Sequence, residues 1–183
     1  MTENELKQHK IAAQKIEEIK NKVFELIKGD LGKISEYDVY KFILAEYKKA
    51  GLFTLAARKK NTFKKSPPQI IVVNENAAMP HYYPQEKNSK IIKKNNLILV
   101  DLWARLKNNN SPFADITWIT YSGKNIPKEI KIIFNKVIKA RNLAIKFIRE
   151  NLKKKKFPRT KTIDKMVKSH RTNEMRVFSF DFG

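Results

Sequence analysis

The sequence predicts an α+β fold in which an antiparallel sheet has helices packed on one face. Apolar residues recur at helical spacing before residue 51 and again after residue 127, whereas short β-branched and aliphatic runs fill the part between. The turn signal NNNSP joins two of these runs, which favours an antiparallel hairpin. Helices followed by such a sheet, and then by a further helix, are typical of the α+β class.

Two helices are expected first, over about 5–29 and 35–50. Apolar residues of the first helix follow steps of three and four: Ala12, Ile16, Ile19, Val23 and Leu26. Ser35 and Asp38 have the spacing of a capping box at the start of the second helix, and Gly51 follows its end. The basic stretch RKKNTFKKSPP is then expected to be a connection.

Strands are expected within about 69–121, in the runs QIIVVNEN, NLILVDLWARL and ADITWITYSG. Side chains alternate along a strand, so Leu97, Leu99, Asp101 and Trp103 share one face. Asp115 begins the partner strand of the hairpin that carries Asp101.

A helix over about 127–152 begins at Pro127, and four lysines after Leu152 suit the negative end of its dipole. Its stripe is apolar apart from one arginine: Ile130, Phe134, Val137, Arg141, Ala144 and Ile148. The following segment shows a short helical pattern and then an aromatic end. We expect one domain over residues 1–165 and a divergent tail over 166–183.

The formal net charge of +21 is compatible with a nucleic-acid partner, because many lysine–phosphate contacts release counterions. Lys far outnumbers Arg, however, as AT-rich coding also produces, so nucleic acid is possible but not favoured. The absence of cysteine excludes disulfides and cysteine-based zinc sites. No signal peptide and no apolar run of spanning length is found, so we expect a cytoplasmic protein with no membrane partner.

Asp101 and Asp115 are candidate metal ligands. A carboxylate among apolar neighbours needs a cation, and two carboxylates facing each other across a hairpin suit hard divalent ions such as manganese, cobalt or iron. The alternative is that one aspartate caps a turn and the other pairs with a lysine. His81 lies between two prolines and beside two tyrosines, in a stiff loop suited to proton transfer or substrate hydrogen bonding. His9 is expected on the exposed side of the first helix.

Three segments in this order, NENAAMPHYYP, NLILVDLWARL and ADITWITYSGKNIPKEIKIIFNKVIKARNLAI, resemble the pita-bread metallopeptidases. The similarity covers about residues 8–165 and is greatest to the Xaa-Pro aminopeptidase branch, in which a Gly-x-x-x-Pro-x-Glu turn leads into a long helix. Here that turn runs from Gly123 to Pro127 and Glu129. The resemblance implies the first half of the pita-bread fold.

The resemblance also implies a dinuclear metal site that removes N-terminal residues from peptides. Asp101 matches the first aspartate ligand, Asp115 the bridging one, and His81 the histidine that contacts substrate. Divalent manganese, cobalt, iron or zinc would be the cofactor, and a peptide the substrate.

The chain departs from the family pattern after residue 165. His170, Arg171 and Thr172 echo a His-Arg-Thr-Gly-His segment, but Asn173 and Glu174 replace its Gly-His, and no Glu-Pro-Gly segment occurs. We therefore expect a truncated member that is inactive alone. The alternatives are a non-catalytic module that contacts protein or nucleic acid through its basic surface, or a homo-oligomer or second-half partner chain that completes the site.

Overall fold

The structure, a computed structural model, describes residues 1–54, 69–79, 82–107 and 111–175. It contains two compact units, Met1–Lys124 and Asn125–Gly183. Within the described ranges, no helix combines the length and the apolar character needed to cross a membrane. The predicted connection at 58–68 lies outside the described residues.

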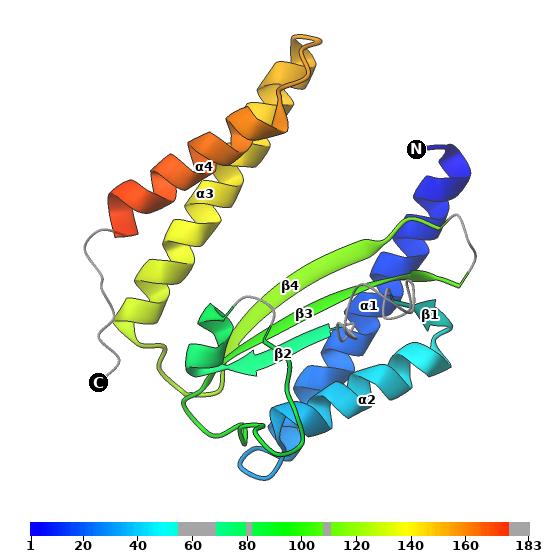
Figure 1. Ribbon diagram of the computed structural model, residues 1–183, viewed down its shortest axis with the longest axis vertical. Helices are drawn as coiled ribbons and strands as arrows, with labels where there is room; N and C mark the ends of the chain where they lie inside the picture. The colour runs from blue at the N-terminus through cyan, green and yellow to red at the C-terminus, as the bar shows by residue number, and fades with distance from the viewer. Residues whose placement is uncertain (55–68, 80–81, 108–110, 176–183) are drawn as a thin grey trace. The chain divides into compact units, whose positions relative to one another are not determined.

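The first unit is an antiparallel sheet with two helices, α1 (Glu3–Gly29) and α2 (Glu36–Lys49), packed on one face (Figure 1). Its strands are β1 (Leu52–Phe53), β2 (Gln69–Val73), β3 (Leu97–Leu106) and β4 (Ala114–Tyr121). The order is β1-β3-β2, and β4 pairs with β3. This arrangement confirms the predicted α+β class.

Local sequence accounts for where both helices begin. The hydroxyl of Ser35 accepts a hydrogen bond from the backbone N–H of Asp38, and the Asp38 carboxylate accepts one from the N–H of Ser35, so the predicted capping box is confirmed. Thr2 and Glu5 form a second capping box at the start of α1.

The core lies between the helices and the facing side of the sheet. Helix α1 buries the stripe Ala12, Ile16, Ile19, Val23 and Ile27. Leu26, the last residue of the predicted stripe, is partly buried and packs against this core, and Ile27 is the buried residue of the same turn. The sheet contributes alternate residues of its strands: Ile71, Val73, Ile98, Val100, Leu102, Ala104 and Ala114.

One predicted strand is shorter than its sequence pattern. After Val73, the segment NENAA forms the 3₁₀ helix η1 (Asn74–Ala78), and Asn74 adopts φ 52°. Asparagine tolerates this left-handed conformation better than most residues, which ends the strand at Val73.

The second unit contains the helices α3 (Lys128–Lys153) and α4 (Thr160–Met175), which pack on each other. The predicted apolar stripe of α3 is only partly correct. Phe134 and Val137 are exposed, and the buried residue of this helix is Ala140. Periodicity alone predicted an apolar face but not which part of it contacts a neighbour.

Candidate functional site

The two predicted carboxylate ligands lie on adjacent strands of the sheet. The β3–β4 pairing is antiparallel, as predicted, and it sets Asp101 opposite Thr117 and Trp103 opposite Asp115. Residues opposite each other share a face, so Asp101 and Asp115 are diagonal neighbours on one face, about 7–8 Å apart. This face is the one opposite the helices, because Leu102 and Ala104 point into the core.

One oxygen of Asp101 is held in place by its cross-strand partner. The Thr117 hydroxyl donates a hydrogen bond of 2.5 Å to Oδ1 of Asp101. Neither Asp101 nor Asp115 forms an ion pair with a described residue, although the chain carries 39 lysines and arginines. The expected alternative, in which one of them pairs with a lysine, therefore has no support among those residues.

The two carboxylates affect each other electrostatically. Partial burial of the Asp115 carboxyl group raises its pKa, and the negative charge of Asp101 raises it further. The Asp115 residue as a whole is nevertheless exposed, so solvent screens much of this repulsion. A cation placed between the two groups would remove it.

Arg105 follows on the same face of β3. Its guanidinium lies over the ring of Phe53, 4.8 Å from the centroid, and 5.6 Å from that of Phe113. These rings position the cationic group at the end of the hairpin beyond Trp103.

His81, the predicted substrate-contacting residue, lies outside the described residues. The chain on both sides of it is described. Met79 donates its N–H to the carbonyl oxygen of Asn76 at 3.1 Å, and the Tyr82 hydroxyl donates to Oε2 of Glu36 at 3.1 Å. The described residues on either side of 80–81 are therefore attached to η1 and to the start of α2.

Glu36 is a fully buried carboxylate of this unit and was not predicted from the sequence. It is 0% exposed, and its Oε1 accepts hydrogen bonds from Val73 N at 2.8 Å and from Asn76 Nδ2 at 3.1 Å. Its Oε2 accepts from the Tyr82 hydroxyl and from Lys90 N, each at 3.1 Å. Burial, together with the charge of Glu36, raises the pKa of Tyr82 to about 12.

Glu36 and its four donors form a hub that joins the start of α2 to three segments distant from it in sequence. A single carboxylate connects the start of α2 to the end of β2, to η1 and to the chain that leads into β3. The sequence predicted only that Glu36 lies in the first turn of a capped helix. Acidic residues are common at that position, so it gave no sign that this one is buried.

The other two histidines lie on helices, His9 on α1 and His170 on α4. The prediction that His9 lies on the exposed side of α1 was wrong, because it is partly buried and its Nδ1 donates to the carbonyl oxygen of Phe113 at 3.0 Å. His170 lies within α4, and its side chain is outside what the structure describes.

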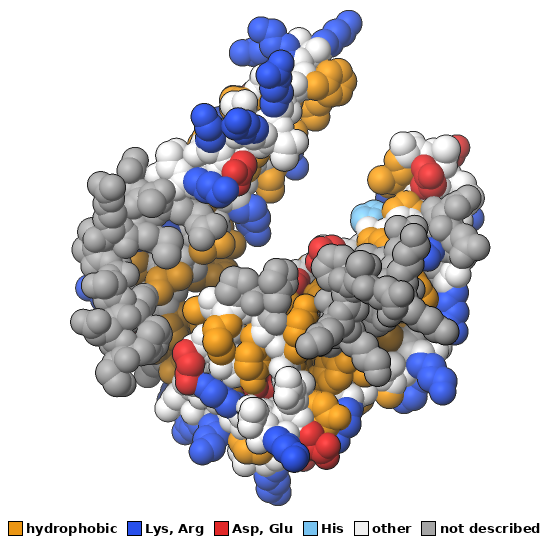
Figure 2. All heavy atoms as spheres, in the orientation of Figure 1, with side chains coloured by type: hydrophobic (Ala, Val, Ile, Leu, Met, Phe, Trp, Pro, Cys, Tyr) orange, Lys and Arg blue, Asp and Glu red, His pale blue; other side chains and the backbone are white. Residues whose placement is uncertain are grey.

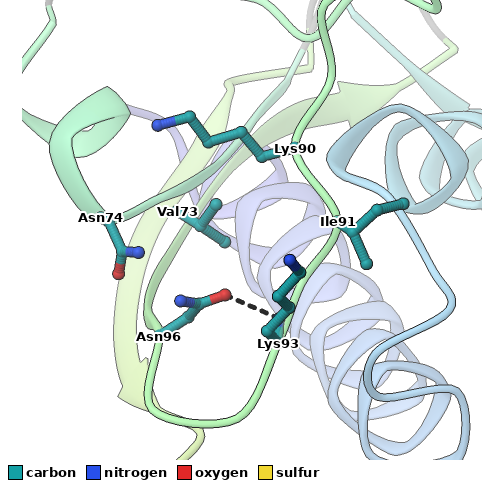
Figure 3. A pocket seen from close by; sticks show the side chains of 6 residues that line it. All are labelled: Val73, Asn74, Lys90, Ile91, Lys93 and Asn96. Atoms are coloured by element: carbon teal, nitrogen blue, oxygen red, sulfur yellow. Dashed lines mark hydrogen bonds between the residues drawn. The ribbon is translucent and has the colours of Figure 1, made fainter.

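A pocket lies next to the start of β3, at the end of the strand away from Arg105 (Figure 3). It is lined by Val73, Asn74, Lys90, Ile91, Lys93 and Asn96. Asn96 accepts a hydrogen bond from Lys93 N at 2.6 Å, and Lys90 pairs with Glu75 outside the lining. Among the described residues that line it there is no Asp or Glu, so the pocket is separate from the aspartate pair.

Two carboxylates on one face suit part of a divalent metal site. Oxygen donors are what hard ions such as manganese prefer, and Oδ2 of Asp101 and the carboxylate of Asp115 have no hydrogen-bond partner among the described residues. Across the same ranges, no group of three or more potential metal-ligating side chains occurs. The two carboxylates are therefore of the ligand type that a hard divalent metal prefers, but they form only part of a full ligand set.

Comparison with solved structures shows where this fold occurs. A prolidase from Thermococcus sibiricus superposes with a TM-score of 0.58 at 22% identity, over 79% of this chain and 34% of that one. An X-Pro aminopeptidase from Thermotoga maritima gives 0.57 at 21%, over 79% and 35%. A methionine aminopeptidase from Thermotoga maritima gives 0.58 at 20%, over 81% and 54%.

The chain thus spans between about a third and just over half of the structures it matches. Identities this low show the fold alone, which is part of the pita-bread fold, as the sequence resemblance implied. No curated protein matches the chain. A family model does match, over residues 7–177 and therefore over nearly its whole length, and the chain belongs to metallopeptidase family M24.

Proposed function

We propose that this chain forms the first half of a metal-dependent aminopeptidase, with Asp101 and Asp115 as two of its metal ligands. The observation that carries this proposal is the unpaired state of the two aspartates among the described residues of a chain with charge +21. Lysines are abundant enough to neutralise two surface aspartates. Two carboxylates on one face of the sheet, without an ion pair to any described residue, favour a bound cation.

The residues of the chain have separate roles in this proposal. The Thr117 hydroxyl fixes Oδ1 of Asp101 and leaves Oδ2 free to bind a metal ion. Asp115 is the ligand proposed to bridge two ions, and His81 is proposed to contact the peptide. Bound divalent ions would polarise a scissile carbonyl and supply a nucleophilic water near neutral pH.

We further propose that the chain alone does not hydrolyse peptides. Two carboxylates hold a divalent ion weakly, and catalysis needs a site with fixed geometry and supporting ligands. A second-half partner chain or a second copy would have to complete the set. Removal of N-terminal residues from Xaa-Pro peptides is the activity that we propose for the completed site, with manganese, cobalt, iron or zinc bound. The boundary between a peptidase part, 1–165, and a tail, 166–183, also stays a proposal, as does a cytoplasmic location.

Calorimetric titration with manganese tests the metal site. The wild-type chain should bind weakly but saturably, and Asp101→Asn and Asp115→Asn should each abolish binding. Asp164→Asn is the matched control, since Asp164 pairs with Lys168 at 2.8 Å on α4 and its loss removes the same charge. Retained manganese binding in Asp101→Asn, or equal loss in the control, would contradict the assignment.

An activity assay tests the second part of the proposal separately. With manganese or cobalt added, the isolated chain should release no N-terminal residue from an Xaa-Pro peptide. Turnover that disappears in Asp101→Asn would show that the chain is active alone, while still supporting the metal ligands.

A second function, a non-catalytic module that binds nucleic acid, is compatible with the charge of +21 although the excess of Lys over Arg does not favour it. Its test is the affinity for duplex DNA at several salt concentrations, because phosphate contacts give a steep linear fall of log affinity with log salt. Affinity that is absent at moderate salt would remove this candidate.

A further inference from the structure

The turn between α3 and α4 concentrates positive charge. Between Glu150 and Asp164 the sequence has no acidic residue and six basic ones: Lys153, Lys154, Lys155, Lys156, Arg159 and Lys161. All six side chains are exposed. Within the described part of the chain, the ion pairs of these two helices join Lys146 to Glu150 and Lys168 to Asp164, and none involves the six.

The turn has a defined backbone. Lys154 N and Lys156 N donate to the carbonyl oxygen of Asn151, at 3.0 and 2.9 Å, and Lys155 N donates to that of Leu152 at 2.9 Å. Lys155 adopts φ 56°, a left-handed conformation in which helices more often place glycine. The six basic residues therefore lie in or beside one tight turn that connects α3 and α4. The helix dipole accounts for cations in the last turn of α3, but not for those beyond it.

Two apolar side chains lie in the same turn. Phe157 is 85% exposed and Leu152 is 47% exposed. Figure 2 shows hydrophobic side chains beside Lys and Arg at this end of the α3–α4 pair. A single exposed leucine needs no explanation, but a phenylalanine with so little protein contact among six cations combines two features that favour an interface with charged, partly apolar material.

We propose that the α3–α4 turn docks on an anionic lipid surface. Lysine and arginine side chains would face the acidic headgroups, and Phe157 would enter the boundary between headgroups and acyl chains. Membrane docking of this kind needs no spanning helix, so it is compatible with the lack of one among the described residues, and it differs from the sequence-based expectation of no membrane partner. The inference goes beyond the proposed peptidase function and does not depend on it.

Shape and composition favour lipid over nucleic acid. Single-stranded nucleic acid is bound in charged grooves with several aromatic side chains for stacking, whereas this turn protrudes and carries one aromatic residue. Five of its six cations are lysines. A lysine attracts many headgroups of an anionic surface as a point charge, but it lacks the bidentate geometry with which arginine binds phosphate.

Sedimentation of the full chain with vesicles tests the proposal. Vesicles of phosphatidylcholine alone should not bind it, and vesicles that also contain phosphatidylglycerol should bind it in a salt-dependent manner. Each lysine neutralised at the surface weakens binding by about fivefold, so replacing the four lysines 153–156 by glutamine should weaken it by roughly several hundredfold. Phe157→Ser should weaken it by about tenfold, because its ring is withdrawn from the apolar boundary.

A matched variant distinguishes the turn from the overall charge. It removes the same four charges at exposed positions of the first unit: Lys10, Lys33, Lys87 and Lys94→Gln. This variant should bind within about fivefold of wild type, the effect of a single neutralised lysine. An equal loss in both quadruple variants would overturn the proposal, and so would a wild-type chain that ignores anionic vesicles but binds a single-stranded oligonucleotide through the turn.

Discussion

Replacing Glu36 by glutamine tests the hub that holds the β2–η1 region against α2. The side chain keeps its size, but one oxygen becomes an NH₂ group that can only donate. Donors point at both oxygens of Glu36: Val73 N and Asn76 Nδ2 at Oε1, and the Tyr82 hydroxyl and Lys90 N at Oε2. Whichever oxygen is replaced, two donors then face a donor.

The expected loss follows from which of these donors can adapt. The amide of Asn76 can flip and the hydroxyl of Tyr82 can rotate, so each can accept from the new NH₂ group. A backbone N–H, either that of Val73 or that of Lys90, cannot adapt and is left unpaired in a buried place. One such donor costs about 1–3 kcal/mol, and the loss of charge weakens the remaining bonds, so we expect Glu36→Gln to lower the free energy of unfolding by about 3 kcal/mol.

Urea unfolding followed by tryptophan fluorescence measures this change, because Trp103 and Trp118 both lie in the sheet of the first unit. Glu17→Gln is the matched control: its side chain is 62% exposed and pairs with Lys20, so its effect should stay within about 0.5 kcal/mol. Spectroscopic titration of tyrosine adds an independent readout, since removing the charge of Glu36 should lower the pKa of Tyr82 from about 12. A stability change below about 1 kcal/mol with the tyrosine titration unaltered would refute the reasoning.

Three further outcomes are expected. Because the folded pKa of Tyr82 lies above its usual value of 10.0, wild-type stability should be complete below pH 10 and should fall as the pH rises towards about 12, which unfolding curves at a series of alkaline pH values measure. The salt bridges to Lys22 and Lys49, at 2.6 and 2.7 Å, lower the pKa of buried Glu46. Glu46→Gln should therefore lower the free energy of unfolding by about 2 kcal/mol at pH 7. In unfolding curves at acid pH, the difference from wild type should vanish below the usual carboxyl pKa range. Gly123→Ala should destabilise by about 1–3 kcal/mol, since its Cβ would lie 2.3 Å from Oδ1 of Asn95 and 2.4 Å from the Tyr121 ring, which is rigid and must shift as a whole, whereas Gly29→Ala, with nothing within 4 Å, should not destabilise in the same thermal scan.

Local patterns predicted the elements of the fold because they depend on neighbours in sequence. The Ser35–Asp38 capping box and the antiparallel pairing of Asp101's strand with that of Asp115 follow from spacing and turn residues, and both occur in the structure. Alternation also placed Leu99 and Asp101 on one face of β3 correctly.

The remaining features depend on contacts that spacing cannot encode. The face of β3 with Ile98 and Val100 is wholly apolar, whereas the opposite face carries Asp101 and Arg105, but spacing does not show which helices cover the apolar face. Glu36 has the sequence context of an ordinary helix-start acid, and its burial arises only when Tyr82 and Lys90 fold back over it. The two-residue strand β1 exists because Leu106 and Arg105 pair with it from far along the chain.

The candidate site and the hub are related by what each does with negative charge. At Glu36 the fold surrounds a carboxylate with four donors from three segments, which is how a protein uses an acid for structure. At Asp101 and Asp115 it provides one hydroxyl, and no described cation, for two carboxylates that repel each other. A chain this rich in lysine would relieve that repulsion by a single substitution at a neighbouring strand position. Repulsion that no described residue relieves costs the folded state free energy that a bound cation would offset, and this difference is the physical ground for proposing that the aspartates serve function and Glu36 serves architecture.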